Sequence, residues 1–179
     1  MTQKYMNIAL SRPNEFNYFK NDIFRHTLKW EGGGKLHNVR GDSGGWTIWG
    51  VAYNFNNQLF SNLADFKDTT YNEAAAIAFV KYYLTVRANI VPNEARLMYF
   101  DIAYNMGNKQ AIKLMQRCVG VKADGIIGVI TESRMAYLTE QCLYDRRTKF
   151  YYSLARRKVR FQRFLKGWLN RTNDIFNIN

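Results

Sequence analysis

Glu31, Asp42 and Thr47 lie in one short stretch of the chain, and together they carry the groups that carboxylate catalysis needs. Cleavage of a glycosidic bond needs a carboxylic acid to protonate the leaving oxygen, and usually a second carboxylate to help water or act as nucleophile. An apolar neighbour such as Trp30 favours the protonated acid, and a threonine hydroxyl can position water. By residue type alone, the simpler interpretation makes Glu31 a solvated residue at a helix end and Asp42 a turn residue.

The chain has few of the residues and motifs that other catalytic chemistries need. The chain has two histidines, His26 and His37, and no His-Glu-x-x-His pattern, whereas a catalytic zinc site needs three protein ligands. A Cys–His pair distant in sequence stays open, but Cys118 and Cys142 lie in apolar helical contexts, where thiols are usually inert. No Gly-x-Ser-x-Gly, P-loop or Gly-x-Gly-x-x-Gly pattern occurs. We therefore expect no metal and no cofactor.

The elements around Glu31 are a helix and a glycine-rich segment. Apolar residues at helical spacing predict an amphipathic helix over about residues 15–31. Gly32-Gly33-Gly34 ends it, because glycine readily adopts the backbone angles of a helix terminus. Residues 32–50 hold seven of the twelve glycines and predict a loop or a short, irregular β-hairpin.

The rest of the chain predicts helices and short turns. Thr70-x-x-Glu73 forms a capping box before another helix, and Thr131 is predicted to cap a helical stretch that reaches about Arg160. Two more helices are expected to end at Gly107 and at Gly120. The fold class is therefore mostly α, with one glycine-rich excursion after the first helix.

Length, charge and cysteine content set further bounds. The 179 residues, 47% of them hydrophobic, suit one globular domain, and the net charge of +12 attracts polyanions such as nucleic acid, an anionic membrane or the bacterial wall. Residues 1–20 hold no apolar run typical of a signal peptide, and no stretch is predicted to span a membrane. We expect synthesis in the cytoplasm and reduced core thiols at Cys118 and Cys142, with one disulfide as the alternative if the protein works outside.

Two segments around the candidate acid resemble the signature of glycoside hydrolase family 108, which includes phage endolysins and secretion-associated muramidases. That family has Glu-Gly-Gly-Tyr followed by Asp-Pro-Gly-Gly-x-Thr, and the order Glu, Asp, Thr also resembles the catalytic triad of phage-type lysozymes. Gly34 stands where the family usually has tyrosine, and Ser43 where it usually has proline. The segments are Trp30-Glu31-Gly32-Gly33 and Asp42-Ser43-Gly44-Gly45-Trp46-Thr47-Ile48-Trp49-Gly50-Val51.

Three later segments resemble the same family in the same order, so that the resemblance extends from about Phe16 to Arg171. They match its Phe-Asp-x-Ala-Val-Asn-x-Gly stretch, its Asp-Gly-x-x-Gly-x-x-Thr stretch in a predicted peptidoglycan-binding region, and its closing Gly-Trp-x-x-Arg segment. The segments are Phe100-Asp101-Ile102-Ala103-Tyr104-Asn105-Met106-Gly107, Val121-Lys122-Ala123-Asp124-Gly125-Ile126-Ile127-Gly128 with Thr131, and Phe164-Leu165-Lys166-Gly167-Trp168-Leu169-Asn170-Arg171.

The resemblance implies a lysozyme-like helical fold in a single domain over residues 1–179. Within it, residues 15–90 would form the catalytic portion and residues 91–179 a helical portion with the predicted peptidoglycan-binding region. Asp124, Gly125 and Gly128 are explained by turn chemistry without a substrate.

The resemblance also implies an N-acetylmuramidase that cuts the β-1,4 bond between N-acetylmuramic acid and N-acetylglucosamine. Glu31 would donate the proton, Asp42 would stabilise the developing positive charge or help activate water, and Thr47 would orient that water. The partner would be bacterial peptidoglycan in the periplasm or cell wall, reached through a holin or another export route. We expect no nucleic-acid partner and no stable membrane insertion.

Six further residues are candidates for substrate binding: Trp30, Trp46, Trp49, Asp101, Tyr104 and Asn105. Asp101 and Asn105 are four residues apart and therefore share one helix face, where they would line the glycan groove. The alternative for Asp101 is a cap or hydrogen bond to a neighbouring loop.

Three alternatives for the function stay open. A lytic transglycosylase would leave 1,6-anhydro ends, a non-catalytic peptidoglycan-binding module would bind without releasing fragments, and a nucleic-acid-binding protein would use the net charge. The basic tract from Arg146 to Arg160 is interpreted as a solvated face that adds electrostatic attraction, although contact with the anionic wall or with lipid head groups is also open.

Overall fold

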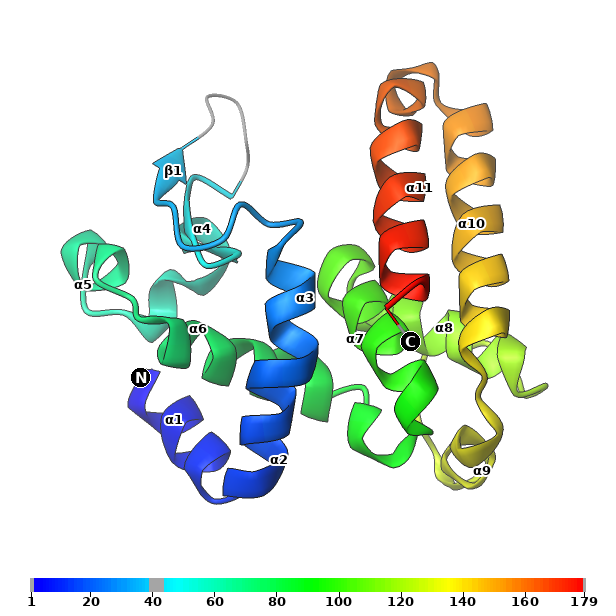
Figure 1. Ribbon diagram of the computed structural model, residues 1–179, viewed down its shortest axis with the longest axis horizontal. Helices are drawn as coiled ribbons and strands as arrows, with labels where there is room; N and C mark the ends of the chain where they lie inside the picture. Colours follow the sequence, from blue (N-terminus) through cyan, green and yellow to red (C-terminus); the bar gives the residue numbers. More distant parts are fainter. Residues whose placement is uncertain (1, 39–43, 179) are drawn as a thin grey trace. The chain divides into compact units, whose positions relative to one another are not determined.

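The computed structural model describes residues 2–38 and 44–178. The chain divides into two compact units, Met1–Lys81 and Tyr82–Asn179, which are largely helical (Figure 1). The predicted mostly α class is confirmed, together with the short β-structure expected in the glycine-rich segment.

Unit 1 packs short helices around an aromatic core. Phe16 and Phe19 place their rings 5.5 and 5.2 Å from the ring of Phe79, and all three side chains are buried. The capping box of Thr70 and Glu73 forms as predicted. The helices are α1 (Thr2–Leu10), α2 (Pro13–Tyr18), η1 (Phe19–Phe24), α3 (Arg25–Leu28), α4 (Tyr53–Asn56), η2 (Asn57–Leu59), α5 (Leu63–Lys67), α6 (Tyr71–Ala78) and η3 (Phe79–Leu84), which runs on into unit 2.

The helix predicted over residues 15–31 exists, with two differences. It begins at Pro13 and passes from α2 through the π-helical turn η1 into α3, and it ends at Leu28. The end comes three residues early because Glu31 already belongs to the glycine-driven turn that follows.

A small antiparallel sheet follows this turn. The described residues form three strands in the order β1 (His37–Asn38), β2 (Trp46–Ile48) and β3 (Val51–Ala52). Thr47, in the central strand, lies opposite His37 on one side and Ala52 on the other.

Unit 2 is built on α7 (Asn93–Met106), a helix buried along most of its length, which contacts α8 (Asn108–Cys118), α10 (Glu140–Arg157) and α11 (Gln162–Phe176). Helices α10 and α11 form a hairpin, drawn in orange and red in Figure 1. Gly107, with φ of 86°, ends α7 as predicted. The short elements are η4 (Ala88–Ile90), α9 (Val129–Arg134), η5 (Met135–Tyr137) and η6 (Val159–Phe161).

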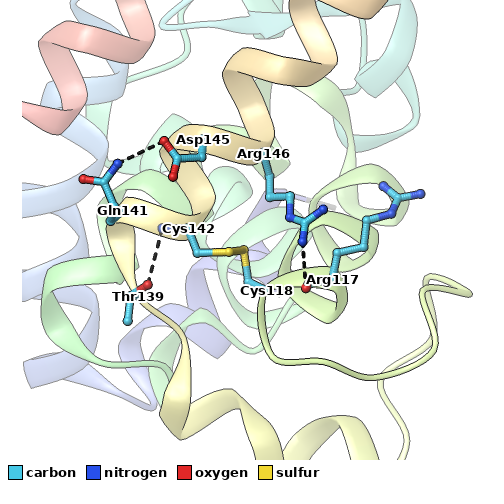
Figure 2. The surroundings of a disulfide bond; sticks show 7 residues. All are labelled: Arg117, Cys118, Thr139, Gln141, Cys142, Asp145 and Arg146. Carbon is cyan, nitrogen blue, oxygen red and sulfur yellow. Dashed lines mark hydrogen bonds between the residues drawn. A yellow bond between two sulfur atoms is a disulfide. The ribbon is translucent and has the colours of Figure 1, made fainter.

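The structure corrects the expected state of the two cysteines. Cys118, the last residue of α8, and Cys142, in the first turn of α10, form a disulfide across 5.7 Å between their Cα atoms (Figure 2). The expectation of reduced core thiols, which rested on synthesis in the cytoplasm, was therefore wrong, and the alternative of one disulfide matches the structure. Only the packing of α8 on α10 brings the two sulfur atoms together.

Thr131 does not cap a helix as predicted. Helix α9 begins at Val129 after Gly128, so Thr131 lies inside it. Its hydroxyl is directed instead to a polar cluster described below.

Candidate active site

Glu31 lies in the turn that ends the helical path of unit 1. Backbone N–H groups of Trp30, Glu31 and Gly33 donate hydrogen bonds of 3.0–3.3 Å to the carbonyl oxygens of Thr27 and Leu28. The two glycines that follow Glu31 have φ angles of 78° and 61°, in the left-handed region that glycine adopts without a steric penalty. The half-buried Glu31 side chain is thus carried on a hydrogen-bonded turn at the helix–loop junction, where the sequence predicted it.

Trp49 connects this turn to the sheet. Its backbone N–H donates to the carbonyl of Gly33 at 3.1 Å, and its indole Nε1 donates to the carbonyl of Thr69, also at 3.1 Å. Its ring lies 5.5 Å from that of Tyr71. A Cβ atom on Gly34 would overlap the six-membered ring of Trp49, so the indole occupies the space in which a side chain at position 34 would begin.

Thr47 belongs to the strand that ends next to Trp49. Its half-buried hydroxyl donates a long hydrogen bond of 3.5 Å to the carbonyl of Gly45. The link from Trp49 to Gly33 ties the end of this strand to the turn that carries Glu31. Unit 1 therefore carries both Glu31 and Thr47, and a backbone hydrogen bond links the two segments on which they lie.

The other two tryptophans of the predicted substrate-binding set are also in unit 1. Trp46 is half-buried on β2, and the ammonium group of Lys67 lies 4.5 Å from its ring centre, a cation–π contact. Trp30 is half-buried next to Glu31. Both half-buried indoles therefore lie in the unit that carries Glu31.

Asp42, the predicted second carboxylate, lies outside the described residues, as does Ser43. Its role stays a prediction.

Asp101 lies inside unit 2 as the centre of a buried ion cluster. Its two carboxylate oxygens accept hydrogen bonds of 2.7 Å from Arg147 and from Arg171, and its side chain is 0% exposed. Burial alone would raise the pKa of Asp101, but the charges and hydrogen bonds of the two arginines outweigh it and lower the pKa to about 2. Asp101 thus binds two neighbouring helices, whereas the alternative to a substrate role had named a cap or a neighbouring loop.

Asn105 shares the helix face of Asp101, as their spacing predicted. Its side-chain oxygen accepts a 2.7 Å hydrogen bond from the hydroxyl of Tyr151, one helical turn beyond the arginine of α10 that binds Asp101. Trp168 stacks on Tyr151 with ring centres 4.9 Å apart. Tyr104 is half-buried, with its ring 4.9 Å from that of Tyr82. Asn105 is exposed and lines a pocket of about 280 Å³ within unit 2.

Sequence reasoning missed Gln116, which organises the Asp-Gly-x-x-Gly-x-x-Thr segment. Its fully buried amide nitrogen donates to Asp124 at 2.9 Å and to Thr131 at 3.3 Å, while its oxygen accepts from the N–H of Gly125 at 2.9 Å. The turn interpretation of this segment is confirmed by these contacts. No sequence signal marks Gln116, because its partners lie 8 to 15 residues away in an irregular loop.

Two features are absent from the part of the chain that the structure describes. Residues 2–38 and 44–178 contain no group of three or more His, Cys, Asp or Glu side chains that could hold a metal ion. Within the same residues, no helix has the length and apolar character needed to cross a bilayer.

Comparison with known proteins identifies two family regions. Residues 24–107 match the family described as Glycosyl hydrolase 108, and residues 110–173 match the Predicted Peptidoglycan domain. The solved structure of SagA from Brucella abortus is similar in fold, with a TM-score of 0.72 and 23% sequence identity over 92% of each chain. No curated protein sequence matches this chain.

The first match contains Glu31, the tryptophans beside it and Thr47, whereas the second contains the Gln116 cluster. The ion pairs join the two matched regions, since Asp101 lies in the first and its partners Arg147 and Arg171 lie in the second. The resemblance noted in the sequence is therefore confirmed by both regions in the expected order. Residues 24–107 therefore form a glycoside hydrolase family 108 region that is followed by a predicted peptidoglycan domain, and the chain is a peptidoglycan hydrolase.

Proposed function

We propose that this hydrolase is an N-acetylmuramidase, which adds water across the β-1,4 bond between N-acetylmuramic acid and N-acetylglucosamine. The observation that carries the proposal is the position of Glu31. It is half-buried on a hydrogen-bonded, glycine-terminated turn that Trp49 ties to the strand bearing Thr47.

Glu31 would act as the general acid. Protonation of the glycosidic oxygen by the Glu31 carboxyl group lets the bond to the leaving sugar break while positive charge develops on the other sugar. A carboxyl group must hold its proton for this role, and the half-buried position of Glu31 removes part of its solvation. The fixed turn also keeps the acid in one place during the reaction.

Asp42 and Thr47 would complete the reaction. The carboxylate of Asp42 would stabilise the oxocarbenium-like charge or take a proton from the attacking water, and the Thr47 hydroxyl would orient that water. Water then adds to the anomeric carbon and a new reducing end forms, while the proton that this water loses returns to the Glu31 carboxylate, either directly or through Asp42.

We further propose a division of labour along the chain. Residues 15–90 would cut the glycan and residues 91–179 would hold the wall, with Trp30, Trp46 and Trp49 contacting sugar rings. The cut would serve cell lysis or wall remodelling after passage through a holin or another export route.

Product analysis tests the bond that is cut. Purified peptidoglycan digested by the protein should release fragments with reducing N-acetylmuramic acid ends, detected by mass spectrometry after borohydride reduction. Fragments with 1,6-anhydro ends would identify a lytic transglycosylase instead, and reducing N-acetylglucosamine ends would identify the other glycosidic bond as the target.

A further inference from the structure

A basic pocket lies between α8 and α10 in unit 2, away from the ion cluster around Asp101. Its volume is about 340 Å³, which is within the size range of small-ligand sites. Four cationic side chains line it: Arg117 from α8, and Arg146, Lys149 and Arg157 from α10. None of its lining residues is acidic.

The disulfide between Cys118 and Cys142 holds α8 and α10 together close to Arg117 and Arg146. The disulfide joins the residue after Arg117 to the first turn of α10, and the Arg146 guanidinium donates a 3.4 Å hydrogen bond to the carbonyl oxygen of Arg117. Figure 2 shows the side chains of Arg117 and Arg146 extending from their two helices to the same side of the disulfide. The nearby carboxylate of Asp145 accepts a hydrogen bond from Gln141 and lines a neighbouring pocket.

Four positive charges around one cavity repel one another, and a bound anion would relieve this repulsion. Arginine is well suited to that task, because its planar guanidinium group forms paired hydrogen bonds to a carboxylate. The charge pattern therefore selects an anionic ligand.

The remaining lining residues define the shape of that anion. Leu114, Phe150 and Leu154 give the pocket an apolar side, and Gln110 and Ser153 add neutral hydrogen-bonding groups. A ligand that carries carboxylates, peptide groups and small apolar side chains fits this mixture better than a bare inorganic anion does. The short peptide stem of peptidoglycan, built from alanine, glutamate and a diamino acid, has these features.

We propose that this pocket binds the stem peptide of peptidoglycan through its carboxylates, with Arg117 and Arg146 as the main anchors. The proposal rests on the proposed function for the identity of the ligand, and it assigns a location in the peptidoglycan-binding domain to wall recognition. The pocket would hold the peptide while unit 1 acts on the glycan.

Binding can be measured without turnover. The full chain with its disulfide intact is titrated by calorimetry with the synthetic tetrapeptide L-alanyl-γ-D-glutamyl-meso-diaminopimelyl-D-alanine. We expect the double variant Arg117→Gln, Arg146→Gln to bind it about tenfold more weakly or worse, since charge-assisted hydrogen bonds are lost. The matched control is Lys122→Gln, Arg134→Gln, which removes the same charge from exposed positions of unit 2 outside the pocket and should bind like the unmodified chain. Circular dichroism verifies that both variants are folded.

Two further ligands separate the chemical sources of the anion. The same peptide with its carboxylates amidated should bind at least about tenfold more weakly, because the arginines lose their charged partners. Equal binding of the two peptides, equal loss in the two double variants, or binding of inorganic phosphate with no binding of the peptide would each overturn the proposal. Cleavage of peptide-free glycan strands by the unmodified chain tests the proposed function separately, so the two failures are distinguishable.

Discussion

At the scale of single residues, Trp49 determines how the turn around Glu31 is built. Trp49 has φ of 51°, one of two described non-glycine residues with a positive φ, and its three contacts to Gly33, Thr69 and Tyr71 compensate for that conformation. Its ring covers Gly34. Glycine at position 34, where the family usually has tyrosine, therefore leaves room for the ring of Trp49.

Gly34→Ala tests this link. The added Cβ overlaps the Trp49 ring, so we expect the free energy of unfolding to fall by about 1–3 kcal/mol, as overpacking does elsewhere. Combined with Trp49→Ala, the same change should cost much less than it does alone, giving a clear coupling in a double-mutant cycle measured by urea unfolding. Strictly additive losses would contradict the contact.

Substitution of Thr47 distinguishes a catalytic role of this residue from a structural one. Because the hydrogen bond that its hydroxyl makes to Gly45 is long, Thr47→Ala should keep the melting temperature nearly unchanged and yet lose most turnover. Thr47→Ser retains the hydroxyl and serves as the matched control, with activity near that of the unmodified chain. Asp42→Asn should lower turnover more than Thr47→Ala, since a full charge near the transition state interacts more strongly than one hydrogen bond. A destabilised Thr47→Ala variant with normal turnover per folded molecule would refute the assignment.

At the scale of elements, α7, α10 and α11 are joined by a buried polar network. Asp101 on α7 binds Arg147 on α10 and Arg171 on α11, and the last of these comes from the closing Gly-Trp-x-x-Arg segment. The segment that begins at Phe100 and the segment that ends at Arg171, which resemble two separate stretches of the family, are therefore in direct contact although Asp101 and Arg171 are 70 residues apart. The network fixes how the three helices pack.

The ion cluster should make unit 2 sensitive to acid. Because the pKa of Asp101 falls from its usual 3.8 to about 2 in the folded state, its charge stabilises the fold above the unfolded pKa and is lost as pH falls through the folded one. Chemical denaturation between pH 5 and about pH 2 should show this loss in the free energy of unfolding, chiefly below about pH 4. Asp101→Asn should lack this part of the pH dependence and be less stable at neutral pH by about 3–5 kcal/mol, as expected when a buried pair is broken. An unchanged pH profile in this variant would contradict the assignment.

Local signals predicted some elements of the fold and missed others, for physical reasons. The capping box at Thr70 and the glycine end of α7 were predictable, because each is encoded by neighbouring residues. The turn at Glu31 was predictable for the same reason. The disulfide was not, since it depends on which helix faces meet after folding, and the sequence shows each face by itself.

The same distinction applies to the candidate site. Residue type and family resemblance pointed to Glu31 and Thr47, which the structure connects through backbone contacts of unit 1. The partners of Asp101 come from 46 and 70 residues away, so helical spacing could predict which face Asp101 occupies but not what it binds.

At the scale of the whole molecule, positive charge is concentrated at one end of the sequence. Residues 146–171 contain ten Lys and Arg residues and no Asp or Glu. Several of these cations are exposed near the turn between α10 and α11, where Arg160 and Arg163 lie over the rings of Phe161 and Phe164. Such a surface attracts an anionic wall over distances of about a Debye length, roughly 8 Å at physiological ionic strength.

Salt should therefore slow the attack on intact walls. Activity on sacculi is expected to fall as ionic strength rises through the physiological range, whereas cleavage of a short neutral chitin-type oligomer, measured in parallel, should change much less. Equal sensitivity for both substrates would mean that salt acts on the fold or on the site and would refute electrostatic attraction as the cause.

The most direct test of the central claim is the rate at which the Glu31→Gln variant releases reducing ends from purified peptidoglycan. Glutamine preserves the size of the side chain but cannot donate the catalytic proton, so the rate should fall by roughly 10²–10⁴-fold while circular dichroism and the melting temperature stay unchanged. Glu15→Gln, a change of the same kind on α2 of the same unit, should leave the rate intact. A folded Glu31→Gln variant that releases reducing ends at the rate of the unmodified chain would contradict the account, because Glu31 could then not be the catalytic acid.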